Sequence, residues 1–225
     1  MLNYLINKMI TILLASYNGE RYIKEAIESI LNQTFTDFEI LIGLNGTTDS
    51  TRNIIDSFDD DRIRLIDYGS DKGKSITLNK LLHEAKYDIL AMMDDDDIWL
   101  PNKLEMQIKL IQDYDIVGTN LNYIDSEGVF IGGEPVIHSD DNIIKYLAKI
   151  GDNQIVNSSS IFKKADAISI GGWRTDIEGI EDYAFWITLM KNDKKFINIP
   201  DRLVLHRLHK NSNFNTKSLD LGTIL

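Results

Sequence analysis

The chain has 225 residues, of which 24 are Lys or Arg and 35 are Asp or Glu, so its formal net charge is −11. This charge argues against a protein that binds nucleic acid by neutralising phosphates. It also argues against general adsorption to anionic membranes, although a local basic patch would escape that test. With no cysteine, the chain has no disulfide framework, no thiolate nucleophile and no cysteine-based zinc site, which fits a reducing cytoplasm.

One short apolar run, residues 9–15, follows Lys8 near the N-terminus. A signal peptide has a similar core, but the branched residues of the run and the turn-prone Asn18-Gly19 after it favour a buried first strand. No run approaches the roughly 20 apolar residues of a membrane-spanning helix. We therefore expect a cytoplasmic protein.

Strand and helix patterns alternate through the first half of the chain. Short apolar, β-branched runs are separated by segments with helical periodicity, which predicts a mainly parallel sheet covered by helices on both faces. Because ligands bind at the carboxyl ends of such strands, we expect residues 17–21, 45–49 and 94–97 to be neighbours. The predicted strands are 9–16, 38–44, 62–68 and 87–93, and the predicted helices are 22–32, 49–57 and 75–85.

The second half of the chain is less regular. A turn-rich extended stretch, residues 123–131, contains Gly128, and no repeat or linker divides the chain, so we expect one domain. The predicted helices are 100–112, 140–149 and 182–192, and the predicted strands are 115–120 and 158–162.

Four adjacent aspartates, residues 94–97, follow the fourth predicted strand directly. Adjacent carboxylates repel one another, so the run needs solvent or a cation beside it. One interpretation is a solvated acidic turn before a helix that starts near Pro101; the three aspartates 59–61 are expected to be a surface run of that kind. The position at a strand end favours a site instead, because carboxylates bind hard divalent ions.

Three kinds of cation site could use these aspartates. A calcium loop of the helix–loop–helix type would need glycine where Trp99 stands. A haloacid-dehalogenase-like phosphatase carries its Asp-x-Asp on the first strand, followed by Thr or Val, whereas this run is followed by Ile98. The third kind is a metal–diphosphate clamp, in which one carboxylate holds a divalent ion and a neighbour bonds a ribose. We favour this clamp.

Six short motifs follow one another over about residues 9–213. They are 15–20 (ASYNGE), 26–34 (AIESILNQT) with 38–40 (FEI), 45–51 (NGTTDST), 94–104, Glu181-Asp182 and 207–209 (RLH). In this order they resemble the motifs of glycosyltransferase family 2, the inverting nucleotide-sugar enzymes of GT-A fold. Residues 94–104 look like the family's Asp-x-Asp segment and its tail, and Glu181-Asp182 resembles the pair that carries the catalytic base.

The resemblance implies an α/β GT-A fold, a mainly parallel, Rossmann-like sheet flanked by helices, in a single domain over residues 1–225. About residues 9–120 would bind the nucleotide sugar and about 121–213 the acceptor. The implied activity is inverting transfer from a UDP-linked sugar to a hydroxyl of a glycan or lipid-linked glycan, in bacterial surface-polysaccharide assembly, with peripheral contact at the inner face of the membrane. The alternative is a non-catalytic sugar-nucleotide-binding subunit of a glycan-assembly complex.

Several residues would bind the nucleotide sugar by this resemblance. Ser16, Tyr17 and Glu20 would line the base and ribose. Asn45 stands where the family usually has an aspartate that contacts the base, and its amide can still donate and accept. Lys74 is either a contact at the nucleotide edge or a solvated lysine at a helix start.

The acid run would hold a divalent cofactor, Mn²⁺ or Mg²⁺. Asp96 is the first choice of ligand, and Asp94 and Asp95 would support the metal and the ribose. His209 would approach the metal or the diphosphate, although a lone histidine is as often an ordinary surface residue.

Asp182 would be the catalytic base on the face of the sugar opposite the leaving diphosphate. The alternative interpretation of Glu181-Asp182 is a helix N-terminus, where acids are favoured, and both can hold together. Glu181 and Trp173 are the expected acceptor contacts, Trp173 by stacking on a sugar ring or, alternatively, as a plain packing residue. Asn157 stands on the acceptor side where relatives often have histidine.

Overall fold

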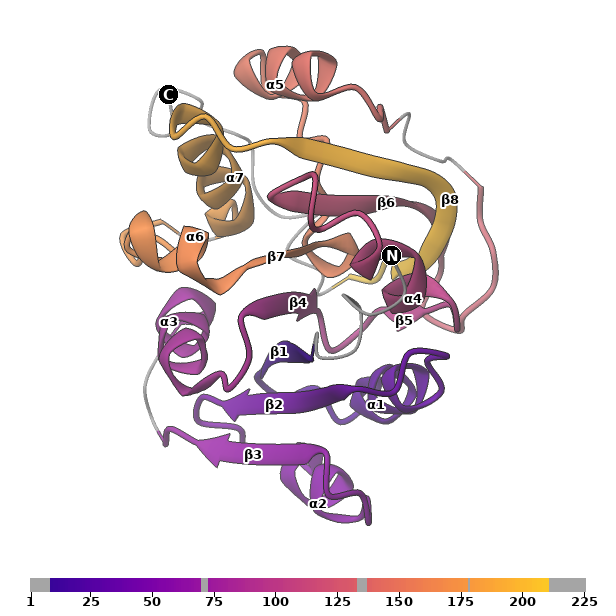
Figure 1. The fold of residues 1–225 in the computed structure, drawn as a ribbon. Helices are drawn as coiled ribbons and strands as arrows, with labels where there is room; N and C mark the ends of the chain where they lie inside the picture. Colours follow the sequence, from indigo (N-terminus) through magenta and orange to yellow (C-terminus); the bar gives the residue numbers. More distant parts are fainter. Residues whose placement is uncertain (1–8, 70–72, 133–136, 178, 211–225) are drawn as a thin grey trace.

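A sheet of eight strands runs through the computed structural model, which describes residues 9–69, 73–132, 137–177 and 179–210. The strand order is β3-β2-β1-β4-β7-β6-β8-β5, and Figure 1 shows it from β3 at the bottom to β8 near the top. The strands are β1 (Ile10–Ser16), β2 (Phe38–Leu44), β3 (Ile63–Asp67), β4 (Ile89–Met93), β5 (Ile98–Trp99), β6 (Ile116–Ile124), β7 (Ile161–Lys163) and β8 (Phe196–Arg207). The helices are α1 (Ile23–Leu31), α2 (Thr51–Asp56), α3 (Lys74–Glu84), α4 (Lys103–Ile108), α5 (Asp141–Lys149), the 3-10 helix η2 (Asn157–Ser159), α6 (Lys164–Ser169) and α7 (Glu181–Lys191).

The strands β3, β2, β1 and β4 are parallel neighbours. β1, β2 and β4 are apolar runs that are buried almost throughout, because helices cover both faces of this part of the sheet. All four strands predicted for the first half are confirmed, with ends that differ by two residues or fewer. The three helices predicted there are confirmed as α1, α2 and α3.

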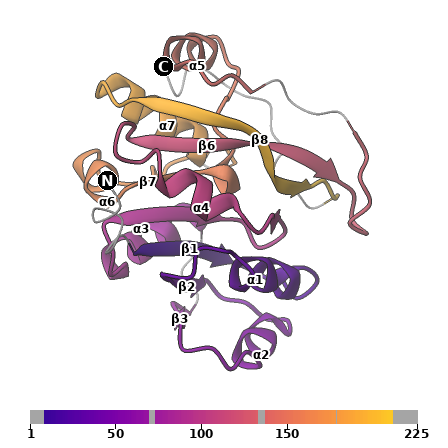
Figure 2. The ribbon, with the colours of Figure 1, turned by 45° about the vertical axis from the view of Figure 1, so that its right-hand side comes forward.

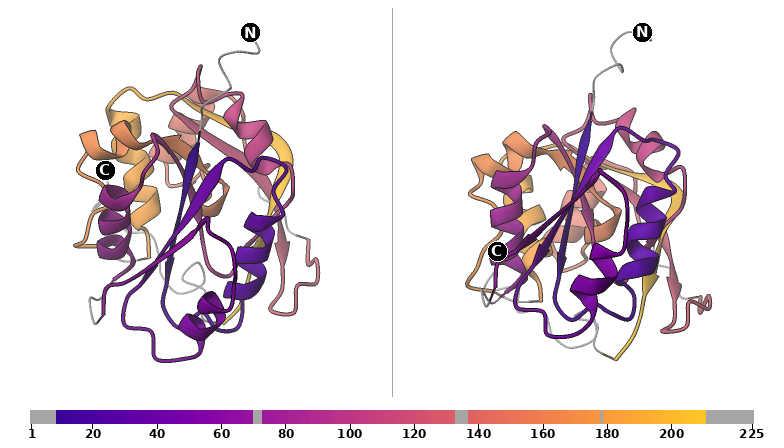
Figure 3. Two further views of the ribbon diagram at one scale, coloured as in Figure 1. Left: turned by 60° about the horizontal axis from the view of Figure 1, so that its bottom comes forward. Right: turned by 90° about the horizontal axis from the view of Figure 1, so that it is seen from below.

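Two apolar cores lie on opposite faces of the sheet, and Figure 3 shows the helices on both sides of it. Successive side chains of a strand point to opposite faces. Leu14 accordingly packs into the core that contains α1, α2 and Leu104 of α4. Leu13 packs into the other core, with Leu81 of α3 and Phe185 of α7.

The longest strand, β8, is not predicted by the sequence patterns. It runs parallel to β6, but the register shifts between Thr119 and Leu121 of β6, which pair with Ile199 and Val204. Pro200 lies within this shift, where its missing N–H removes no ladder hydrogen bond. Figure 2 shows the two strands side by side, with a bend in β8. The irregular pairing accommodates Pro200, but a proline in the middle of the segment made the strand unrecognisable in the sequence.

The rest of the second half follows the predictions with changes in length. The helix predicted at 100–112 is helical only as α4, to Ile108, and the strand predicted at 115–120 extends to Ile124 as β6. The strand predicted at 158–162 begins with η2 and becomes the short β7, antiparallel to β4 and β6. Helices α5 and α7 are confirmed, and α6 is not predicted. Among the described residues, no helix combines the length and the apolar character needed to cross a bilayer.

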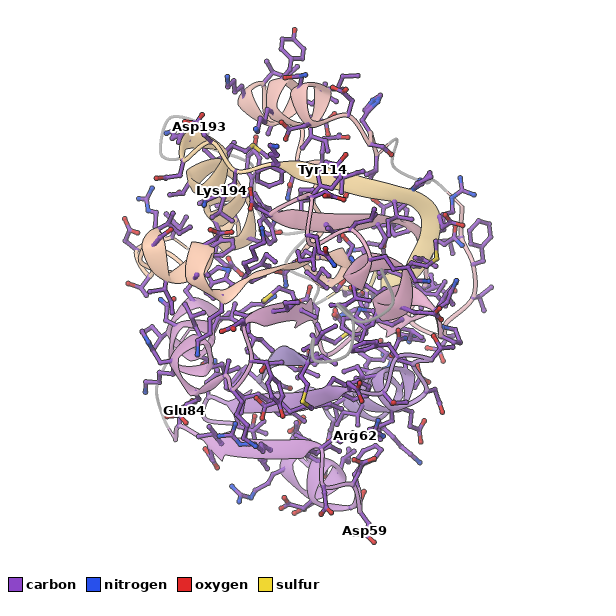
Figure 4. All side chains as sticks on the ribbon, in the orientation of Figure 1. Asp59, Arg62, Glu84, Tyr114, Asp193 and Lys194 are labelled. Carbon is purple, nitrogen blue, oxygen red and sulfur yellow. The ribbon has the colours of Figure 1, made fainter. Side chains whose placement is uncertain are left out.

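The aspartate run 59–61 precedes β3 at the periphery of the molecule, where Figure 4 labels Asp59. Asp59 and Asp61 are exposed, and Asp60 forms an ion pair with Arg62 at 2.8 Å. These residues form the solvated surface run that the sequence predicts, in contrast to the aspartates after β4.

Candidate functional site

The carboxyl ends of β1, β2 and β4 meet at one edge of the sheet. β1 lies between the other two, with Ser16 paired to Leu44 and Leu14 paired to Met93. Ser16 Oγ donates a hydrogen bond to Asp95 Oδ2. Gly19 makes this approach possible, because a Cβ at that position would lie 2.4 Å from Asp95 Oδ2. The residues expected to be neighbours here are brought together.

The loop after β1 is tied to the loop after β2. Asn18 Oδ1 accepts from the Thr48 amide at 2.9 Å, and Glu20 Oε2 accepts from the Ser50 amide at 2.9 Å. Tyr17 is 59% exposed. Asn45 Oδ1 is buried and has no donor within the described ranges. Tyr17 and Asn45 thus border this edge with an open aromatic face and an unused acceptor.

Asp94 is held by two donors at the same oxygen. Lys74 Nζ forms an ion pair with Asp94 Oδ1, and Asn157 Nδ2 donates to it at 2.9 Å. Burial alone would lower the pKa of Lys74, but the negative charges of Asp94, Glu181 and Asp182 outweigh it, so the pKa is raised. Lys74 is therefore a charged member of the cluster and not a solvated lysine.

Asp95 and Asp96 lie close to other negatively charged carboxylates. Burial and the neighbouring charge of Asp96 raise the pKa of Asp95 to about 7, although Ser16 stabilises its ionised form. Asp96 Oδ2 lies 2.9 Å from His209 Nε2, and the His209 ring packs on Tyr22 with 5.1 Å between ring centroids. A residue from the end of the described chain thus completes the aspartate cluster.

Asp97 has a different role from its three neighbours. Its side chain is fully buried and accepts from Ser158 Oγ and from the Arg207 amide, the latter at 2.9 Å. His206 Nδ1 lies 3.0 Å from Asp97 Oδ2. Burial would lower the pKa of His206, but the charge of Asp97 raises it to about 9. Asp97 therefore fastens the aspartate loop to β8 and η2.

The Arg207 side chain is the second anchor of this loop. Its Nε donates to the main-chain oxygen of Asp96 at 2.8 Å, and one terminal nitrogen binds Glu25 of α1 at 2.6 Å. The guanidinium also lies over the Tyr22 ring, 4.5 Å from its centroid. The sequence pattern marks Arg207 only as part of a motif, because its contacts depend on the path of β8.

Asp182 occupies the first turn of α7. Burial and the charge of Glu181 raise the pKa of Asp182 to about 6, while Lys74 and the Tyr183 amide act in the opposite direction. A carboxylate with this pKa is ionised at neutral pH and is a stronger base than an ordinary aspartate. Glu181 beside it is 6% exposed, and its Oε2 has no donor in the described part of the chain.

Trp173 requires a correction to the expected acceptor platform. Its side chain is 2% exposed, and its ring is stacked on Phe185 with 4.4 Å between centroids and an interplanar angle of 6°. Asn79 fixes its main chain by two hydrogen bonds of 2.7 and 2.8 Å. Since no ring face is open to a sugar, the packing alternative describes Trp173 in this structure.

The donor set beside Asp96 suits a divalent ion. Within the described ranges no three His, Asp or Glu side chains are already grouped as a complete metal site. Asp96 and His209 offer one oxygen and one nitrogen at 2.9 Å from each other, next to the crowded Asp94 and Asp95. Oxygen with imidazole nitrogen suits Mn²⁺, and the remaining coordination positions of such ions are commonly filled by phosphate and water.

The chain is similar to three proteins of known name or structure. The UDP-Glc:alpha-D-GlcNAc-diphosphoundecaprenol beta-1,3-glucosyltransferase WfgD of Escherichia coli is 28% identical over 219 residues, covering 95% of this chain and 82% of WfgD. S. aureus TarS 1-349 in complex with UDP-GlcNAc superposes with a TM-score of 0.76 at 16% identity, covering 94% of this chain and 62% of that one. The mannosyltransferase PcManGT from Pyrobaculum calidifontis, in complex with GDP-Man and Mn²⁺, gives 0.70 at 18% identity, covering 93% and 60%.

These solved structures confirm the GT-A fold, and this chain spans about three fifths of the length of the two structural neighbours named above. The sequence model described as glycosyl transferase family 2 matches residues 11–175, which include the strand ends, the aspartate loop and Asn157. The chain therefore belongs to glycosyl transferase family 2, a family of glycosyltransferase enzymes.

Proposed function

We propose that the chain is a metal-dependent inverting glycosyltransferase that moves a sugar from a UDP-linked donor to a hydroxyl of a glycan or lipid-linked glycan in bacterial surface-polysaccharide assembly. The observation that carries the proposal is the convergence of Lys74, Asp94 and Asp182 from α3, the β4 loop and α7. The name of WfgD specifies a UDP-linked donor and a diphosphoundecaprenol-linked acceptor, and TarS binds UDP-GlcNAc. Both support the substrate class.

The donor would bind across the strand ends. Ser16, Tyr17, Glu20 and Asn45 line the edge formed by β1 and β2, which supports binding of the base and ribose there. Asp95, held by Ser16, would bond the ribose. In this arrangement about residues 9–120 serve the donor and about 121–213 serve the acceptor.

Asp182 would remove the proton from the acceptor hydroxyl as the hydroxyl oxygen attacks the anomeric carbon. Attack from the face opposite the diphosphate inverts the configuration at that carbon. The pKa of Asp182, about 6, matches this task, because the carboxylate is ionised at neutral pH and binds a proton more readily than an ordinary aspartate. Glu181 would orient the acceptor beside it.

Asp96 and His209 would hold Mn²⁺ or Mg²⁺. A bound divalent ion stabilises negative charge that develops on a departing diphosphate. Arg207 keeps Asp96 in position through the main-chain oxygen, and Asp97 fixes the end of the same loop. Arg207 and Asp97 would thus keep Asp96, one of the two proposed metal ligands, in a fixed position next to Asp95.

Release of UDP tests this proposal against that of a non-catalytic subunit. The chain would be incubated with UDP-glucose or UDP-N-acetylglucosamine, with Mn²⁺, with Mg²⁺ or with EDTA, and UDP would be measured without added acceptor. An enzyme of this kind hydrolyses donor slowly, so we expect UDP with either ion and none with EDTA. Binding of donor with no UDP under any condition would support the non-catalytic subunit.

A further inference from the structure

Asn157 is a polar residue at the site with no role in the proposed transfer so far. It opens η2, which leads into β7 beside β4. The residue is 5% exposed, and its Nδ2 donates to Asp94 Oδ1 at 2.9 Å, the same oxygen that accepts from Lys74. Asn157 is therefore attached directly to the aspartate cluster.

The orientation of the Asn157 amide follows from this contact. Turning the amide over would place its oxygen against Asp94 Oδ1, and two acceptors at that distance repel each other. Oδ1 must therefore face away from Asp94, and it is buried with no donor in the described part of the chain. A buried carboxamide oxygen without a donor is unfavourable, and at a position attached to the aspartate cluster a bound ligand can satisfy it.

Glu181 provides a second acceptor of the same kind. Its Oε2 is buried without a donor among the described residues, and its charge contributes to the raised pKa of Lys74. Two unused acceptors thus flank the Lys74–Asp94 pair. A diphosphate at neutral pH offers acceptors only and cannot satisfy either of them, whereas sugar hydroxyls donate hydrogen bonds.

We propose that Asn157 is a specificity-determining residue for the donor, whose Oδ1 accepts a hydrogen bond from a hydroxyl of the sugar being transferred. This inference rests on the proposed transfer reaction. Asn157 lies in the half of the chain that is expected to bind the acceptor, but its bond to Asp94 puts it beside the donor side of the cluster. Glu181 adjoins the base Asp182 on the acceptor side. The same amide also keeps Asp94 in place through its nitrogen.

The test compares normal donors with donors that lack one hydroxyl. Release of the nucleoside diphosphate would be measured as UDP from UDP-glucose and UDP-N-acetylglucosamine and as GDP from GDP-mannose. The same assay would then be run with the monodeoxy analogues of the sugar that the unmodified chain turns over. We expect one analogue to be turned over at least about tenfold less well in kcat/KM, since the site would lose one hydrogen bond. In Asn157→Ala this discrimination should fall to about onefold, because the acceptor is gone.

Asn198→Ala is the matched control. Asn198 lies on β8 and is also buried with an unused Oδ1. Its Nδ2 donates to the main-chain oxygens of His138 and Gln154 and not to the aspartate cluster. The Asn198→Ala variant should discriminate against the deoxy analogue as strongly as the unmodified chain does. If thermal melting shows Asn157→Ala to be unfolded, Asn157→Gln carries the same comparison, because it retains an amide but displaces the oxygen.

The outcomes separate this inference from the proposed function. No turnover of any nucleotide sugar would overturn the transfer reaction and the role of Asn157 with it. Turnover without discrimination against any deoxy analogue, or discrimination that Asn157→Ala retains, would overturn the role of Asn157 alone.

Discussion

At the scale of single residues, Lys74 links the two parts of the site. It forms an ion pair with Asp94 and lowers the pKa of Asp182 through its positive charge. Burial and the charge of Glu181 nevertheless raise the pKa of Asp182 to about 6, so its carboxylate loses its charge as the pH falls through that value. The proposed general base must be ionised to accept a proton, and turnover should therefore decline below about pH 6.

The Lys74→Met variant should move this decline to higher pH. Without the ammonium group, burial and the charges of Glu181 and Asp94 still raise the pKa of Asp182. Of the two influences that lower this pKa, only the hydrogen bond from the Tyr183 amide remains. The measurement is the midpoint of the acidic limb of kcat/KM for donor hydrolysis or transfer. Lys24→Met, at an exposed lysine of α1, is the control and should leave the midpoint unchanged. An unchanged midpoint in Lys74→Met would contradict the coupling.

Asp182→Asn should make the folded protein more stable at neutral pH. The pKa of Asp182 in the folded protein, about 6, lies above the ordinary aspartate value of 3.8. Asp182 therefore stabilises the fold fully below pH 3.8 and loses this contribution as the pH rises through 6. Partial exposure reduces the effect to roughly 1–2 kcal/mol. The melting temperature should rise by about 2–8 °C at pH 7.5 and by less at pH 5. A lower melting temperature at pH 7.5 would contradict this assignment.

At the scale of elements, β8 and the β4 loop depend on each other through Asp97. Removing its carboxylate leaves the Ser158 hydroxyl, the Arg207 amide and His206 without their shared partner in a buried place. Asp97→Ala should therefore lower the free energy of unfolding by about 3–5 kcal/mol. Chemical denaturation measures this, with the exposed Asp59→Ala as a control that should change it by less than about 0.5 kcal/mol.

The elements that could be predicted from sequence are those with a clear period and clear ends. The alternation of apolar runs with helices such as α1 and α3 identifies the parallel half of the sheet. β8 could not be predicted because Pro200 interrupts it and because its pairing with β6 and β5 depends on the tertiary fold. The strand predicted at 158–162 includes Ser158 and Ser159, which the structure places in η2, where they are buried without joining a ladder.

At the scale of the whole molecule, the topology decides which distant residues meet. The carboxyl ends of the predicted parallel strands were sufficient to bring residues 17–21 close to residues 94–97. Ser16, directly before the first of these segments, accordingly bonds Asp95, 79 residues away. The contacts of Asp97 and Arg207 could not be predicted, because they require β8 to return to the aspartate loop. Trp173 could not be assigned either, since only the packing of α7 shows that Phe185 occupies its ring face.

Donor and ion together should stabilise the whole molecule. Ligands that bind only the folded state add about 2.7 kcal/mol at a concentration 100 times their Kd. For a chain of this size, the melting temperature should rise by roughly 5–10 °C with UDP-glucose and Mn²⁺, and by less with either alone. Asp96→Ala should remove the dependence on Mn²⁺, while a full response in that variant would argue against Asp96 as a ligand.

The assignment of Asp182 as the base is tested most directly by combining turnover with donor binding in Asp182→Asn. Calorimetric titration with the donor and Mn²⁺ should give a Kd within about threefold of the unmodified chain, because the base does not hold the nucleotide. Acceptor-dependent transfer should fall by about 100- to 10,000-fold. Transfer at the normal rate, or a loss of donor binding equal to the loss of turnover, would contradict Asp182 as the base.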